Sequence, residues 1–272
     1  MREYIRSLWQ MTRDIACNLR RIAALAYFQY MVGTKDLFLG GIWKLLSPLI
    51  QIGVYWLVFG IGLRSGSPVD GIPYVVWLTC GLTPWLMMNQ GVNRGAGSIY
   101  GKAAMLTRSN IPTCLIPLSN VAAVFLDSCW TILILLFIYF GNGCRPTWAA
   151  LWLVYYLVCA VVFVSVLSLI TSVLVMLARD FQNLIQAILR LLFFLCPVFW
   201  QPGDNAPLLL KIFDYCNPFG YVIRGFRNSL LYHTSILSNG GETAVFWCIV
   251  LALYLLGSSF QSKMRKNLLD YL

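Results

Sequence analysis

Charge and histidine are scarce in this chain of 272 residues. Only 11% of the residues are charged, acidic side chains number ten, and His233 is the single histidine. One histidine alone cannot form a metal site. The acidic residues are scattered, and no nucleophile–base constellation is visible. We therefore expect no catalytic residues and no metal ligands in this chain.

A disulfide framework is also absent. The chain has nine cysteines, an odd number, with no C-x-x-C pair, and most of them lie within hydrophobic runs. Small buried thiols are the expected role, rather than metal ligands or disulfides.

A nucleotide-binding loop is lacking as well. A phosphate-binding P-loop needs G-x-x-x-x-G-K followed by Ser or Thr. Here Gly101 and Lys102 are followed by Ala103, and Ala96 occupies the position of the first glycine. The sequence therefore predicts no cofactor in this chain, so any ATP must be bound elsewhere. The polar interval 93–113 instead predicts a short helix over residues 98–107 that begins at a serine cap.

Long hydrophobic runs are what the chain has in abundance. Hydrophobic residues make up 59% of the sequence. Runs of about 18 apolar residues predict membrane-spanning helices, and no run shows the period-2 alternation of a barrel strand. We expect an all-α integral membrane protein whose six transmembrane helices cover residues 45–63, 72–88, 114–140, 148–178, 184–200 and 244–260.

The distribution of basic residues predicts the orientation. Six spans place both termini on one side, and 14 of the 20 Lys and Arg residues fall there, against five on the other side. Because positive loops stay in the cytoplasm, both termini are expected to be cytoplasmic. The net charge of +10 is then explained by topology and does not require nucleic-acid binding.

We predict one permease domain over residues 1–272. Residues 1–44 comprise an amphipathic helix and a connector, residues 45–260 hold the spans, and residues 261–272 form a cytoplasmic tail. The apolar side of the first helix, which includes Trp9, suits an interfacial helix on the inner leaflet. Packing against a cytoplasmic partner is the alternative. The charged start predicts that there is no cleaved signal peptide.

Two features interrupt the pattern of spans. Residues 207–213 and 219–232 are apolar but too short to cross, and Asn217-Pro218 separates them, so re-entrant outer helices are expected between spans five and six. Asp127 and Arg190 lie inside predicted spans, where a lipid-facing charge is costly. Either they pair with each other, or Arg190 faces a polar path and meets an anionic group.

Several stretches resemble one family. They are YMVGTKDLFLGGIWKLLSPLIQ (30–51), RDFQNLIQAILRLLFFLCPVFW (179–200) and NPFGYVIRGFRNSLL (217–231). Together these stretches, in their order along a chain of this length, resemble the membrane subunits of ABC exporters for polysaccharides and teichoic acids. The stretch YWLVFGIGLRSGSPVDGIPYVVWL (55–78) is most similar to the permeases that translocate wall teichoic acid.

The resemblance implies a homodimer in the bacterial plasma membrane, paired with two copies of a separate ATPase that binds ATP and Mg. It implies export of a polymer linked to undecaprenyl diphosphate, with membrane lipid and no nucleic acid among the partners. Export of O-antigen or capsular polysaccharide is the alternative within the family, and export of small drugs is a further one. A lipid-modifying enzyme would need a polar catalytic cluster, and a scaffold would not need Asp127 or Arg190.

The resemblance also indicates candidate sites. Aromatic faces for sugars and one arginine for phosphate would form the substrate path: Tyr55, Trp56, Phe59, Trp77, Trp85, Arg190, Phe193, Phe194 and Trp200. The outer gate would contain Phe213, Tyr215, Phe219, Tyr221, Arg224 and Arg227. Coupling to the ATPase would involve Ser98, Tyr100, Lys102, Met105, Leu106, Arg108, Arg179 and Asp180. Independently of this role, Asp180 is expected to cap the fifth span.

Overall fold

The computed structural model describes residues 2–33, 40–63, 66–102, 112–201, 203, 207–235 and 240–266. Within these residues the fold is all-helical apart from one bridge between Val69 and Ile72, which confirms the predicted class. The helices are α1 (Arg2–Cys17), α2 (Leu19–Val32), α3 (Ile42–Tyr55), η1 (Trp56–Leu63), α4 (Tyr74–Ala96), α5 (Ser98–Gly101), α7 (Leu115–Gly141), η2 (Trp148–Leu151), α8 (Trp152–Leu177), α9 (Asp180–Leu195), α10 (Leu208–Cys216), α11 (Pro218–Leu230) and α12 (Gly240–Lys266).

Four helical segments in the described part of the chain are long and apolar enough to cross a membrane. They are Ile42–Leu63, Leu115–Gly141, Trp148–Leu177 and Gly240–Ser262, with 22, 27, 30 and 23 residues. They match the first, third, fourth and sixth predicted spans. The first one changes from α-helix to π-helix at Trp56.

The second and fifth predicted spans correspond to α4 and α9. Neither of these helices is among those long and apolar enough to cross a membrane. At 16 residues, α9 is about 24 Å long, shorter than a bilayer core of about 30 Å. The prediction that this helix continues to residue 200 is wrong. It ends at Leu195, and Cys196 is extended (φ −76°, ψ 151°) because Pro197 disfavours a helical residue before it.

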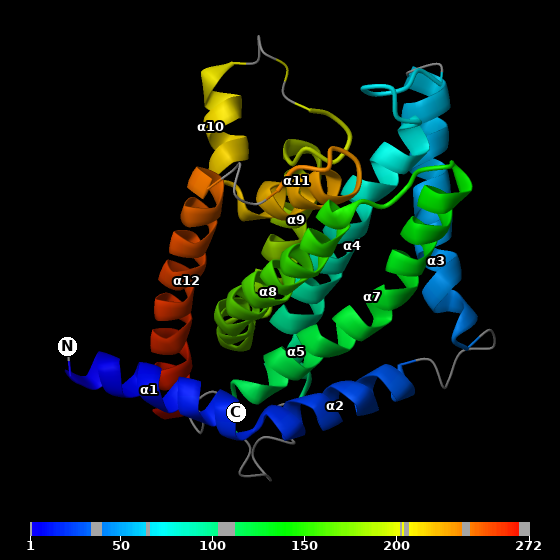
Figure 1. The fold of residues 1–272 in the computed structure, drawn as a ribbon. Coiled ribbons are helices and arrows are strands. Elements are labelled where there is room, and N and C mark those ends of the chain that lie inside the picture. Colours follow the sequence, from blue (N-terminus) through cyan, green and yellow to red (C-terminus); the bar gives the residue numbers. More distant parts are fainter. Residues whose placement is uncertain are drawn as a thin grey trace.

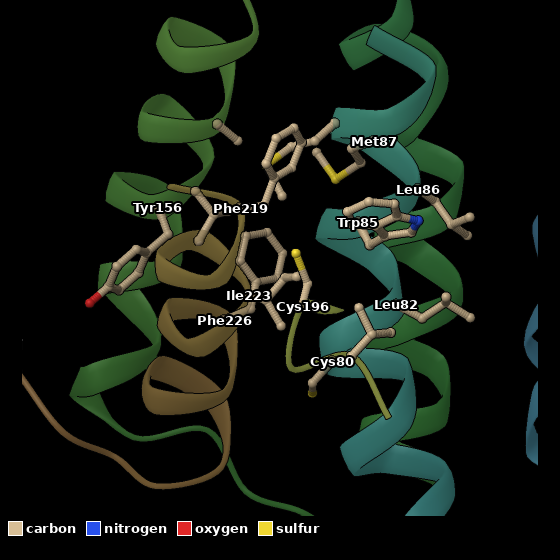
Figure 2. Close-up of a cluster of buried hydrophobic side chains, with 14 of the residues drawn as sticks. Cys80, Leu82, Trp85, Leu86, Met87, Tyr156, Cys196, Phe219, Ile223 and Phe226 are labelled. Atoms are coloured by element: carbon tan, nitrogen blue, oxygen red, sulfur yellow. The ribbon is translucent and has the colours of Figure 1, made fainter. Parts of the chain in front are cut away.

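The core is built around α4, which contacts α7, α8 and α11. Nearly every residue from Tyr74 to Met88 is buried. Figure 2 shows Phe219, Ile223 and Phe226 of α11 between Tyr156 and Trp85. Protein therefore surrounds α4 from Tyr74 to Met88, whereas Gln90 and Arg94 farther along the helix are exposed.

Small residues bring α4 close to α8. A Cβ atom added at Gly91 would lie 2.7 Å from Val164 Cγ1, and one added at Gly95 would clash with the Ser168 side chain. The spacing of four residues on both helices places these contacts on one face, as in small-xxx-small packing of membrane helices.

At one end of the bundle, which we call the base, α1 and α2 lie across the helix ends (Figure 1). Met11 is buried, and Thr12 Oγ1 is 2.8 Å from Tyr254 Oη of α12. Gln29 Nε2 donates to Ser119 Oγ of α7 at 3.1 Å. Part of the predicted amphipathic segment thus packs on this chain's own bundle, while Trp9 remains 61% exposed.

At the opposite end, the top, lie the two short helices α10 and α11 (Figure 1). They confirm the predicted pair of short helices divided at Asn217-Pro218. The Asn217 side chain accepts from the Phe219 amide at 3.0 Å and so caps α11, and Pro218 opens the helix.

Candidate functional site

Four of the predicted path residues meet in one aromatic cluster. Tyr55 lies 5.3 Å from Phe193 between ring centroids, and Trp85 lies 5.3 Å from the same ring. Phe59 stacks at 4.3 Å on Phe199, a residue that sequence reasoning missed although it follows Pro197 in an aromatic run. These rings fix the end of α9 against α3, η1 and α4.

Of the other aromatic path candidates, Phe194 borders this cluster, with its ring centroid 5.3 Å from that of Phe193. Trp77 is fully buried and stacks on Tyr74, while Trp56 is 39% exposed. Phe194 is 62% exposed, and its carbonyl accepts from Trp200 Nε1 at 2.9 Å. The aromatic candidates therefore divide between internal packing and the outer surface of the subunit.

Arg190 is exposed on α9, and its Nε donates to the Gln186 carbonyl of the same helix at 3.3 Å. Asp127 instead pairs with Lys44 Nζ at 2.8 Å and with Arg94 Nη1 at 2.9 Å. The alternative in which Asp127 pairs with Arg190 is therefore wrong. The reason is geometric: Asp127 faces α3 and α4, and both of those helices supply a cation.

At the top, Arg224 joins three helices. It pairs with Asp214 of α10 at 2.5 Å and with Glu242 of α12 at 2.9 Å. Burial raises the pKa of the Asp214 carboxyl, and the nearby Arg224 charge opposes that rise. Arg224 therefore fixes α10 and α12 relative to α11.

The aromatic candidates of the predicted gate also lie near the top. Tyr221 is buried, with its hydroxyl 3.0 Å from Thr243 Oγ1. Phe219 packs 5.6 Å from Trp85, so it connects this region to the aromatic cluster. Phe213 is half-buried and Tyr215 is exposed.

Arg227 is buried and faces inward, with only 3% of its surface exposed. Its Nη1 and Nη2 donate to the carbonyls of Pro197 and Val198, each at 2.6 Å, and its Nε donates to the Trp77 carbonyl at 3.4 Å. The guanidinium also lies 3.4 Å from the Trp77 ring centroid. These contacts satisfy the carbonyls that follow the end of α9, and we call this group the Arg227 clamp.

At the base, the two predicted coupling segments are neighbours. The guanidinium carbon of Arg179 lies 4.3 Å from the centroid of the Tyr100 ring. Gln182 Nε2 of α9 donates to the Asn93 carbonyl of α4 at 3.3 Å. The start of α9 therefore contacts both α5 and the end of α4.

The expected serine and aspartate caps are not formed. Ser98 is buried and donates to the Gly95 carbonyl at 2.6 Å, so Gly97 takes the cap position of α5. Asp180 is exposed in the first turn of α9 and follows the cap position. Its charge still suits the positive helix end.

The remaining coupling candidates divide between described and undescribed residues. Lys102 is partly buried, and this burial lowers the pKa of its ammonium group. Met105, Leu106, Arg108 and the second half of the helix predicted over 98–107 lie outside the described residues.

Comparison with known proteins adds to this geometry. The family model described as "ABC-2 type transporter" matches residues 20–231. The chain belongs to the ABC-2 type transporter family. It is therefore a multi-pass membrane subunit of a transporter, and the match extends over every candidate site described above.

Three curated relatives resemble this ABC-2 permease over most of their length. A protein named O-antigen export system permease protein RfbA from Myxococcus xanthus is 27% identical over 231 residues, which is 83% of this chain and 85% of that protein. Two proteins of the same name from Klebsiella pneumoniae are 26% and 24% identical, covering 75% and 88% of this chain and 82% and 89% of their own lengths.

Proposed function

We propose that this permease exports a lipid-diphosphate-linked surface polysaccharide from the cytoplasmic to the outer side of the plasma membrane. The observation that carries the proposal is the likeness to O-antigen export permeases over three quarters or more of the chain. The chain has no P-loop, so ATP and Mg are bound by a separate ATPase, two copies of which serve the complex.

Two polymer classes have support. The three relatives favour an O-antigen-type polysaccharide. The resemblance of residues 55–78 to teichoic acid permeases favours wall teichoic acid. Because the relatives match 75–88% of the chain, we take the O-antigen type as the first candidate.

The proposed topology has six spans and cytoplasmic termini, with α4 and α9 as the second and fifth spans. Burial of α4 inside the bundle from Tyr74 to Met88 supports its role as a span, and the exposed polar residues Gln90 and Arg94 lie toward its base end. The basic residues are concentrated at the base and in its flanking segments, which supports a cytoplasmic base.

Two copies of the chain would complete the path. Large apolar side chains on the outer faces of α3, η1 and α9 are exposed in the single subunit, among them Leu57, Leu63, Leu191 and Phe194. Exposed apolar faces of this kind support contact with lipid or with a second subunit. With a second copy present, Arg190 and the aromatic cluster would border the path between the subunits.

Depletion in the native cell tests the proposal. We expect lipid-linked polymer to accumulate inside the membrane while the surface loses it, measured by fractionation and glycan analysis. Sugar composition and phosphate content then distinguish O-antigen-type polymer from teichoic acid. Unchanged surface glycans would rule out the proposed substrate.

A further inference from the structure

A small polar cavity lies at the base, between α2, α3, α4 and α7. Its volume is about 190 Å³, and its lining includes Lys44, Ser47, Gln90, Arg94 and Asp127. A cavity needs only about 10–15 Å³ to hold one water molecule, so this one has room for a small hydrated anion.

Lys44 is held firmly in this cavity. Its Nζ pairs with Asp127 Oδ1 at 2.8 Å and donates to the Tyr30 carbonyl at 3.0 Å. It also lies 3.3 Å from the centroid of the Tyr30 ring. An ammonium group has three donors, and these contacts occupy it. Lys44 therefore supplies charge and fixes Asp127.

Arg94 is placed differently. Its side chain is 54% exposed, and Nη1 donates to Asp127 Oδ2 at 2.9 Å. That bond uses one of the five N–H donors of a guanidinium, and no other partner is found among the described residues. Arg94 can therefore bind a ligand without breaking its contact with Asp127.

The charge and the position of the cavity indicate the class of ligand. Two cations and one carboxylate leave a net charge of +1. Lys44, which lines the cavity, donates to the Tyr30 carbonyl, so the cavity lies level with the end of α2, the helix expected at the membrane surface. A guanidinium binds phosphate in a two-point fork, and anionic headgroups gather at this depth.

We propose that this cavity binds the phosphate group of a membrane lipid, with Arg94 in contact with the phosphate and Lys44 and Asp127 as positioning residues. Trp43 also lines the cavity and is 40% exposed, which suits contact with the lipid chain. Resting on the proposed function, the lipid is the diphosphate carrier of the polymer. An anionic phospholipid offers the same chemistry.

Binding of geranylgeranyl diphosphate to the full-length protein tests this site. The measurement is made in a maltoside detergent, which contains no phosphate. We expect Arg94→Gln to weaken binding about tenfold or more, as for the loss of a charge-assisted hydrogen-bonded pair. The matched control is Arg20→Gln, which removes one exposed charge from α2, and its effect should stay below about twofold.

Two further arms complete the test. Arg94→Lys keeps the charge but loses the fork, so an intermediate affinity is expected even if the glutamine variant folds poorly. Phosphatidylglycerol is then added as a competitor. If it displaces the diphosphate at equal concentration, the phospholipid is the natural source, and if it does not, the polymer carrier is.

Equal affinities for the wild-type protein, Arg94→Gln and Arg94→Lys would overturn the site. This failure is separate from failure of the export proposal, because the probe carries no polymer. Unchanged surface glycans after depletion would leave the binding result intact, and retained binding in the Arg94 variants would leave the export assignment intact.

Discussion

Arg227 at the top and Arg94 at the base are the same side chain in opposite settings. Arg227 is 3% exposed and donates to three carbonyls from two other segments. The Arg94 side chain is 54% exposed and has one carboxylate partner. A guanidinium whose donors are satisfied by the backbone holds a fold together. One with donors left over at the membrane surface is suited to bind a ligand.

The largest effect is expected from Arg227→Leu. Removing the guanidinium leaves the carbonyls of Pro197 and Val198 without this donor inside the fold, which should cost about 3 kcal/mol or more. The check is thermal unfolding of the purified protein in detergent. Arg145→Leu, at an exposed arginine, is the control. If both variants unfold at the wild-type temperature, the clamp does not stabilise the fold.

Gly81→Ala should disturb the same clamp from the other side. A Cβ atom at position 81 would clash with Arg227 Nη2, and such overpacking costs about 1–3 kcal/mol. Gly101→Ala is the matched control, because a Cβ atom there meets nothing within 4 Å. A Gly81 variant as stable as the control would show that the guanidinium can shift freely.

Asp127→Asn tests the ion pairs of Asp127 with Lys44 and Arg94 at the base. The loss of the carboxylate leaves Lys44 and Arg94 uncompensated, which should lower stability by about 1–2 kcal/mol. The net charge of the cavity rises from +1 to +2, so affinity for geranylgeranyl diphosphate should increase. Unfolding and binding are measured on the same sample. Weaker binding would mean that positioning of Arg94 by the carboxylate outweighs the added positive charge.

The smallest effect is expected at a third arginine, Arg179. Tyr100→Leu removes the cation–π contact between the Tyr100 ring and Arg179, which is worth about 0.5–1 kcal/mol at an exposed site. In a complex reconstituted with the ATPase, polymer export per ATP hydrolysed should fall about two- to fivefold. An unchanged ratio would mean that the Arg179–Tyr100 contact does not link the two coupling segments. Tyr27→Leu, at an exposed aromatic of α2, is the control.

Local patterns predicted much of this fold. Hydrophobic runs located the long helices, and Asn217-Pro218 marked the break between α10 and α11. The end of α9 was misjudged because the apolar run continues past Pro197, while the proline stops the helix at Leu195. The caps at Ser98 and Asp180 were misjudged because each residue lies one position beyond the cap.

Long-range pairings were beyond local patterns. Asp127 is 33 residues from Arg94 and much farther along the chain from Lys44, so neither pairing leaves a periodic trace. The inward direction of Arg227 depends on where the segment after α9 passes, and sequence spacing does not reveal that. Charge placed inside an apolar run was the informative signal, and it identified Asp127 without its partners.

ATP-driven movement of the polymer tests the central claim most directly. Inverted membrane vesicles that contain this permease and its ATPase would be loaded with lipid-linked polysaccharide, and protection of the polymer from an added glycosidase would be measured. The account predicts protection that requires ATP and is lost when the permease is omitted. Polymer that stays fully accessible with ATP present would contradict it.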